Sequence, residues 1–203
     1  MTLQDRCQNY QKIFPKWPPP VVQNNRIHGI WIMGNDYRGS GYHGAYPPNY
    51  LRRVMALFPD RKKILHLFSG SLPKGDYIRF DLRKDVDCDM RGNAEEISKH
   101  FPNPTFDLIL ADPPYTDEDA HKYGNPMVNR NKVLHECWKV LYPEGYVVWL
   151  DQVLPMYSKN HWILDGVIGI VRSTMHRFRC CVIFRKKRWI QEPKMTSLLL
   201  GLK

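Results

Sequence analysis

The chain has 203 residues, a length that suits one domain with a sizeable core better than two domains. Hydrophobic residues make up 43% of it, which excludes wholesale disorder. Thirty lysines and arginines against 20 acidic residues give a formal net charge of +10. That balance favours a polyanionic partner, with nucleic acid ahead of an anionic membrane.

Three further patterns concern the compartment and the metal content. The longest apolar run, around 162–171, is broken by Asp165 and Gly166 and falls short of the ~18 residues that a membrane span needs. The first residues, MTLQDRCQNYQ, lack the apolar core and the cleavage site of a secretory signal. The five cysteines are odd in number and show no Cys-x-x-Cys spacing. We therefore expect a reduced, cytoplasmic protein that binds no metal and enters no membrane.

The first 45 residues predict a loosely structured arm. Prolines crowd residues 15–20, and a glycine-spaced aromatic stretch fills 34–44, so turns are favoured throughout. A single domain is expected from 46 to 190, with a tail at 191–203. Its first element is a helix, because apolar residues recur at helical spacing from Leu51 to Phe58 after two prolines and before Pro59.

Short apolar runs further along predict buried strands. They lie at Ile64–Phe68, Tyr77–Leu82, Phe106–Ala111, Tyr146–Leu150, Gly166–Ser173 and Phe178–Phe184, with a very short one at Val86–Met90. Helices are expected from Ala94 to Pro102 and from Val133 to Leu141, where apolar residues mark one face. Strands that alternate with helices indicate an α/β fold with a mainly parallel sheet.

The tetrapeptide Asp112-Pro113-Pro114-Tyr115 follows one of these strands, where an open parallel sheet binds its ligands. An exocyclic amine of a nucleobase is a poor nucleophile, so a site that methylates it must accept hydrogen bonds from both amine hydrogens. Asp112 offers a carboxylate, and Pro113 offers a carbonyl in a segment that the next proline keeps extended. Tyr115 offers a flat ring on which a flipped base can stack. The alternative is a plain turn with Tyr115 at the edge of the core.

With Phe68-Ser69-Gly70-Ser71 after an earlier strand, this tetrapeptide resembles the class I S-adenosylmethionine-dependent methyltransferases that act on amino groups of nucleobases. The DNA adenine-amino (N6) methyltransferases are the most similar by motif. The segment His43–Pro47 and the later strands resemble the family as well, so the likeness covers about 43–185. It implies a Rossmann-like fold with helices on both faces of a mostly parallel sheet, S-adenosylmethionine as cofactor, and direct in-line methyl transfer.

The resemblance also implies roles for individual residues. Asp112, Pro113, Pro114 and Tyr115 would be catalytic. The cofactor would be held by Tyr46, Pro47, Phe68, Ser69, Gly70, Ser71, Asp81, Asn93, Ala94 and Asp112. Gly70 would let the backbone approach the cofactor closely, and Asp81 would bind its ribose. Alternatively, Asp81 is a solvated acid near arginines, and Asn93 is an ordinary helix cap.

Two features depart from the family pattern. Leu72 stands where the glycine loop usually ends in glycine. Only five residues separate Ser71 from Tyr77, and the crossover after Asp81 is equally short, although a parallel crossover usually takes a dozen or more. We therefore expect the first crossover helices to be shortened or missing. Asp85, Asp87 and Asp89 are then alternative ribose ligands.

Basic and aromatic residues after the catalytic turn and near the C-terminal end are candidates for nucleic-acid contacts. They are Lys122, Tyr123, Asn129, Arg130, Arg172, His176 and Arg177. A solvated loop and a charged strand end are the alternatives. Because no insertion is long enough for a separate recognition domain, we expect either a short or relaxed target sequence, or recognition supplied by a homodimer or a partner chain. DNA is favoured over RNA; an RNA base-amino methyltransferase and a non-catalytic nucleic-acid-binding module of the same fold are the other hypotheses.

Overall fold

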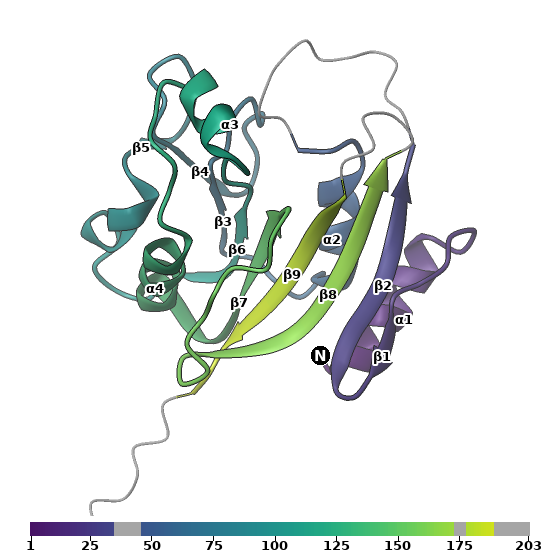
Figure 1. Cartoon of the computed structure of the whole chain (residues 1–203). Helices are drawn as coiled ribbons and strands as arrows, with labels where there is room; N and C mark the ends of the chain where they lie inside the picture. Colours follow the sequence, from purple (N-terminus) through teal and green to yellow (C-terminus); the bar gives the residue numbers. More distant parts are fainter. Residues whose placement is uncertain (35–45, 173–177, 189–203) are drawn as a thin grey trace, which may run out of the picture.

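The computed structural model describes residues 1–34, 46–172 and 178–188, and its nine strands form one sheet (Figure 1). The strands are β1 (Val21–Gln23), β2 (Arg26–Met33), β3 (Ile64–Leu67), β4 (Ile78–Asp81), β5 (Met90–Arg91), β6 (Phe106–Ala111), β7 (Leu141–Asp151), β8 (Trp162–Arg172) and β9 (Arg179–Lys186). The helices are α1 (Leu3–Ile13), α2 (Tyr50–Leu57), the 3₁₀ helix η1 (Ala94–Lys99), α3 (Asp117–Lys122) and α4 (Arg130–Val140). The sequence thus predicts most of these elements, although β5 and η1 are shorter than expected.

The strand order is β1-β2-β8-β9-β7-β6-β3-β4-β5. Five neighbouring pairs are parallel (β2–β8, β3–β4, β3–β6, β4–β5 and β6–β7) and three are antiparallel. The strands β3 to β7, numbered along the chain, lie in the order 3-2-1-4-5, which is the Rossmann-like arrangement. The expected mainly parallel α/β sheet is confirmed. Its topological switch point lies between β3 and β6.

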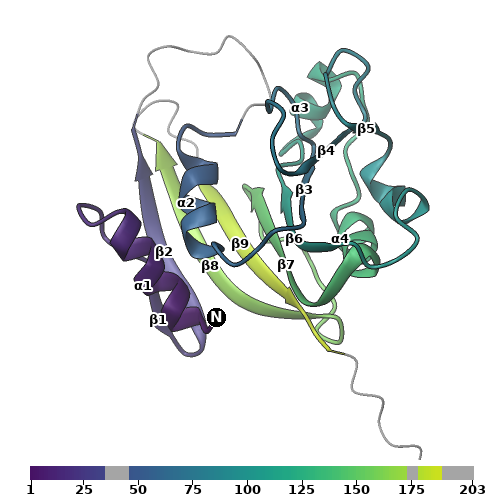
Figure 2. The same cartoon turned by 180° about the vertical axis from the view of Figure 1, so that it is seen from behind.

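Helices cover both faces of the sheet. Figure 2 shows α1 and α2 on one face, and Figure 1 shows α4 on the other. Alternate residues of β6 supply the two cores: Leu108 and Leu110 belong to the cluster with α1 and α2, whereas Ile109 and Ala111 belong to the cluster with η1 and α4. The period-two alternation of a strand explains why one apolar run serves both faces.

The expectation of a loosely structured N-terminal arm is wrong for residues 1–34. Helix α1 begins with a capping box, in which the side chains of Thr2 and Asp5 each accept a hydrogen bond from the other's backbone N–H. Asn24 and Asn25 both have positive φ and form the two-residue turn between β1 and β2. Two positive-φ residues match the twist of a β-hairpin, for which asparagine is well suited. The prolines lie in the α1–β1 connection, so the domain begins well before residue 46.

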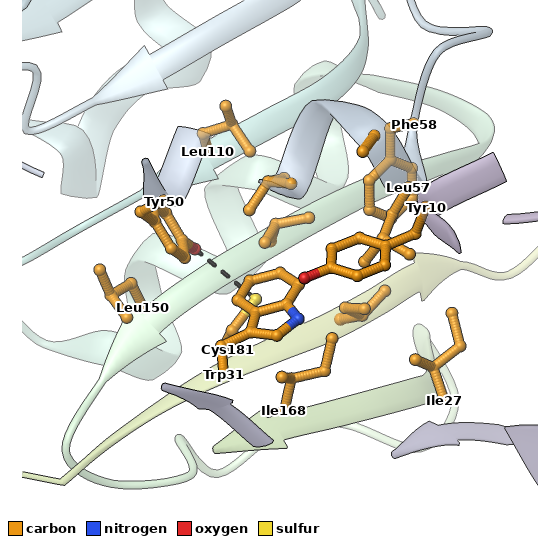
Figure 3. Close-up of a cluster of buried hydrophobic side chains, with 14 of the residues drawn as sticks. Tyr10, Ile27, Trp31, Tyr50, Leu57, Phe58, Leu110, Leu150, Ile168 and Cys181 are labelled. Carbon is orange, nitrogen blue, oxygen red and sulfur yellow. Dashed lines mark hydrogen bonds between the residues drawn. The ribbon is translucent and has the colours of Figure 1, made fainter. Parts of the chain in front are cut away.

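The N-terminal elements contribute to the core itself (Figure 3). Tyr10 of α1 stacks on Trp31 of β2 with ring centroids 5.7 Å apart, and Tyr50 of α2 meets Trp31 edge-on at 6.3 Å. The Tyr50 hydroxyl lies 3.6 Å from Sγ of Cys181 in β9, within hydrogen-bonding range of the sulfur. The aromatic side chains of α1 and β2 therefore extend the sheet's core beyond β8.

No helix interrupts the connections after β3 and β4, as the short crossovers predict. A buried arginine links these connections instead. Nη1 of Arg79 donates to the Leu72 carbonyl at 3.0 Å and to the Asp87 carboxylate at 3.2 Å, and Nη2 donates to the Asp89 carboxylate at 3.0 Å. The hydrogen bonds that Arg79 donates to Asp89 raise the pKa of Arg79, so the guanidinium stays charged in this buried position.

Candidate active site

A pocket of about 300 Å³ opens where the carboxyl ends of β3, β4 and β6 meet, at the switch point of the sheet. Pockets of this size and place are typical of small-molecule sites. The predicted site residues on its wall are Phe68, Gly70, Asp81, Asn93, Ala94, Asp112, Pro113, Pro114, Tyr115, Tyr123 and Arg172. The fold therefore brings together the predicted cofactor segments and the predicted catalytic turn.

The loop after β3 turns sharply beside the pocket. Phe68 has φ +58°, a left-handed conformation that costs a side-chain-bearing residue roughly 1–2 kcal/mol, and Gly70 has φ +53°. Such strain is typical of functional loops. Ser69 between them is buried, and its Oγ has no hydrogen-bond partner among the described residues. A loop with an unpaired hydroxyl and strained backbone suits close approach to a ligand.

The Asp81 carboxylate is fixed by backbone donors. Oδ2 accepts from the Gly70 N–H at 2.9 Å, and Oδ1 accepts from the Arg83 N–H at 2.9 Å. The three alternative acids are absent from the pocket wall: Asp85 pairs with Arg83, whereas Asp87 and Asp89 hold Arg79. Of these four candidate ribose ligands, Asp81 is therefore the one placed to meet ligand hydroxyls with its remaining lone pairs.

Asn93 and Ala94 form the next part of the wall, after β5. Oδ1 of Asn93 accepts a hydrogen bond from the Glu95 N–H at 2.9 Å, so Asn93 is the N-cap of η1, which was the alternative to a role in binding. It also lines the pocket, and the two roles coexist because the cap uses only one atom of the amide.

Asp112 lies at the carboxyl end of β6, and its carboxyl group has an unusual pKa. Burial raises the pKa to about 7, and the nearby charge of Asp151 adds to that rise. A hydrogen bond from Tyr115 and the positive charge of Arg179 act in the opposite direction. The Tyr115 hydroxyl donates to Oδ1 of Asp112 at 2.6 Å. An acid poised near neutral pH in a pocket is a candidate for hydrogen-bond acceptance or proton transfer.

Two arginines hold the turn in place. The Arg179 guanidinium lies 5.0 Å from the centroid of the Tyr115 ring, a cation–π geometry. Nη2 of Arg130 donates to the Tyr115 carbonyl at 3.0 Å, and its Nε donates to the Asp151 carboxylate at 2.7 Å. The Asp151 side chain is fully buried and that of Arg130 is 21% exposed, so Arg130 supports the turn, and its contact with nucleic acid stays a prediction.

Several predicted residues lie off the pocket wall: Tyr46, Pro47, Ser69, Ser71, Lys122, Asn129 and Arg130. The Tyr46 hydroxyl lies 3.3 Å from Nδ1 of buried His66, whose pKa burial lowers to about 3. Asn129 caps α4 through a bond from the Lys132 N–H at 3.1 Å. His43, His176 and Arg177 lie outside the described residues.

Sequence reasoning missed part of the wall. The additional residues are Phe80, Leu82, Arg83, Gly92, Glu95, Asp119, Asn125, Pro126, Val128 and Arg179. The Arg83 guanidinium lies 5.0 Å from the centroid of the Tyr123 ring, which connects the loop after β4 to the loop after α3. The sequence does not single out Arg179 for the pocket, because its place there depends on the pairing of β9 with β8.

The described residues contain no group of three or more His, Cys, Asp or Glu side chains that could hold a metal ion. Within the same part of the chain, no helix combines the length and apolar character that crossing a membrane requires.

No family model matches the sequence, and no curated protein matches it. Among solved structures the chain is similar to TrmN from Thermus thermophilus, with a TM-score of 0.50, 17% identity, and coverage of 71% of this chain and 50% of that one. A Streptococcus mutans protein described as an S-adenosylmethionine-dependent methyltransferase follows, with a TM-score of 0.44, 10% identity, and coverage of 70% and 50%. The chain spans about half the length of these structures. It has the Rossmann-like methyltransferase fold.

Proposed function

We propose that this protein transfers a methyl group from S-adenosylmethionine to an exocyclic amino group of a nucleobase, adenine in DNA foremost. The observation that carries the proposal is the placement of Asp112 and Tyr115 in one pocket with Gly70 and Asp81. Asp112 and Tyr115 follow β6 on one side of the switch point, whereas Gly70 follows β3 and Asp81 ends β4 on the other side. A cofactor on one side would thus face a base on the other.

The residues on the β3–β4 side fit the cofactor. The carboxylate of Asp81 is fixed for a diol, and Gly70 on the pocket wall would let an amino acid moiety approach the backbone of the loop. Asn93 and Ala94 would meet the adenine of the cofactor. When bound, S-adenosylmethionine supplies an electrophilic methyl group on sulfur.

The residues on the β6 side act on the amine. The carboxylate of Asp112 accepts one amine hydrogen bond, and the Pro113 carbonyl accepts the other, so the nitrogen lone pair is freed from the ring. Methylation of the nitrogen would release one proton, which the carboxylate of Asp112 would accept. One face of the Tyr115 ring lies against Arg179, and the other is the surface for the flipped base.

The net charge of +10 supports a polynucleotide as the substrate. DNA is the first expectation, RNA the second, and a second copy of the chain or a partner chain would supply recognition. One experiment distinguishes DNA from RNA as the substrate. The purified protein is incubated with S-adenosylmethionine carrying a labelled methyl group and with DNA or RNA, and the digested nucleosides are analysed by mass spectrometry.

Labelled N6-methyladenine from DNA is the expected product. Label in RNA alone would replace DNA by RNA as the substrate. Cofactor binding without label in either polymer would favour the non-catalytic module. Asp112→Asn serves as the matched control, because it keeps the size of the side chain and removes its negative charge.

A further inference from the structure

Two arginines enter the pocket from the strands on the far side of Asp112. Arg172 is the last residue of β8, and Arg179 is the first residue of β9. The antiparallel register places Arg179 opposite Ile170, and Arg172 lies two residues beyond Ile170 on the same strand. Because side chains alternate across a strand, both arginines point to the same face of the sheet. Both line the pocket.

Within the described part of the chain no carboxylate pairs directly with either arginine, although the charge of Arg179 lowers the pKa of nearby Asp112. Neither guanidinium forms an ion pair there, and the Nε atom of each is shielded from solvent without a hydrogen-bond partner. Arg79, Arg130 and Arg185 differ, because each binds at least one carboxylate. Two like charges with unused donors in one pocket are unfavourable on their own, so the arrangement favours an anionic ligand.

The position of the two arginines distinguishes between two anions that could bind there, the carboxylate of the cofactor and a phosphate of the polynucleotide. Strand β9 is separated from β3 by β7 and β6, and β8 lies one strand further away. Arg179 on β9 is therefore three strand spacings, about 14 Å, from the strand that leads to Gly70, and Arg172 on β8 is four, about 19 Å. The carboxylate of the cofactor would bind near the loop at Gly70. Arg179 instead lies against the Tyr115 ring, beside the proposed base. The anion closest to a flipped base in a polynucleotide is its own backbone phosphate.

We propose that Arg172 and Arg179 form a phosphate-binding pair that holds the backbone next to the target nucleotide, an inference that rests on the proposed function. The pair would distinguish a nucleotide within a strand from a free base or nucleoside. A guanidinium pair is suited to this task, because its fork of N–H donors matches the oxygens of a phosphate.

The test uses a fluorescently labelled oligothymidine strand with one central adenine and the full-length protein saturated with S-adenosylhomocysteine. In two further strands, the linkage on the 5′ or the 3′ side of the adenine is a neutral methylphosphonate. An oligouridine series with one adenosine is run in parallel. Fluorescence anisotropy gives the affinities of the wild type, of Arg172→Gln/Arg179→Gln, and of the control Arg52→Gln/Arg188→Gln, whose arginines are exposed and off the pocket wall.

We expect one neutral linkage to weaken wild-type binding about ten- to a hundredfold, the loss typical of charge-assisted hydrogen bonds. The Arg172→Gln/Arg179→Gln variant should bind the all-phosphate strand with an affinity reduced by a similar factor. Replacing that linkage with the neutral one should not reduce the variant's affinity any further. The control double variant should keep the wild-type response. The wild-type comparison needs no mutation, so it stands even where a variant fails to fold.

Equal wild-type affinity for the charged and the neutral linkages would overturn the inference. So would a double variant that keeps its affinity for the strand but loses affinity for S-adenosylhomocysteine, because the pair would then hold the cofactor. The proposed function fails separately: a clear linkage effect without methyl transfer contradicts the reaction alone, whereas methyl transfer without a linkage effect contradicts the phosphate pair alone.

Discussion

The hydroxyl of Tyr115 donates a hydrogen bond to Oδ1 of Asp112 at 2.6 Å, within the turn that ends β6. Sequence reasoning gives Tyr115 only a stacking surface. The structure adds an electrostatic role, because this hydrogen bond lowers the pKa of Asp112 while burial raises it to about 7. Tyr115 therefore helps to set the pH range in which Asp112 is a carboxylate.

The first prediction is a pH-dependent rate. Ionised Asp112 is the stronger acceptor and is the form that can take the amine proton, so single-turnover methyl transfer should rise as the pH increases through about 7. Tyr115→Phe removes a bond that lowers the pKa, so its midpoint should lie at higher pH than that of the wild type. Tyr142→Phe is the matched control, because its hydroxyl contacts Lys63 outside the pocket. An unchanged midpoint in Tyr115→Phe would contradict the electrostatic role.

The ring of Tyr115 gives a second prediction. Tyr115→Ala removes the stacking surface as well as the hydroxyl, so binding of the base should weaken by ~1–3 kcal/mol beyond the effect of the Phe variant. Strand affinity measured with S-adenosylhomocysteine present checks it. If the Phe and Ala variants bind equally weakly, stacking is not the role of the ring.

Asp112→Asn should abolish methyl transfer and leave cofactor binding measurable. It should also change stability in a pH-dependent way. The folded carboxyl group keeps its proton up to about pH 7, whereas the unfolded one releases it near 3.8, so the wild type loses stability as the pH rises between these values. Asparagine has no such loss. The variant's melting temperature should exceed that of the wild type at about pH 8, and the gain should shrink towards about pH 4. A gain independent of pH would show that Asp112 ionises normally.

Asp81→Asn should weaken S-adenosylmethionine binding. The amide loses the charge that strengthens ribose hydrogen bonds, and only one of its two ends can accept from the backbone N–H groups of Gly70 and Arg83. A loss of about 1.5–3 kcal/mol in calorimetry is expected. Asp85→Asn, an exposed acid on the same loop, is the control. A larger loss in the control would move the ribose site to the later acids.

Arg79→Met tests what replaces the missing crossover helices. The substitution leaves Asp89 without its guanidinium partner and frees the Leu72 carbonyl. Because Asp87 and Asp89 are exposed, the expected loss is that of hydrogen bonds to a charged group, about 1.5–3 kcal/mol, and denaturant unfolding would measure it. Lys99→Met, which removes an exposed pair with Glu96, should stay within about 1 kcal/mol of the wild type. Equal effects of the two variants would show that Arg79 does not hold the crossovers.

The sequence by itself determined the central strands and the catalytic turn. The runs ending at Ala111 and Leu150 are apolar on both faces because helices cover both sides of the sheet. A continuous apolar run of this kind can be recognised in the sequence without knowledge of distant contacts. The catalytic turn from Asp112 to Tyr115 could also be predicted from the sequence, because the four residues that carry the proposed chemistry are adjacent. The capping box at Thr2 and the Asn24-Asn25 turn are also local sequence patterns. The prolines at residues 15–20 favoured the prediction of a loosely structured arm instead.

Only the tertiary structure decided the rest. Strand β2 becomes part of the sheet through its pairing with β8, where Ile27 lies opposite Gly166, and no local pattern specifies a partner so distant in sequence. The same holds for Arg179, which reaches the pocket because β9 pairs with β8. The pKa of Asp112 depends on how completely the fold removes water from one carboxyl group. Desolvation and long-range register are properties of the assembled chain, because they arise from contacts between segments that the sequence keeps apart.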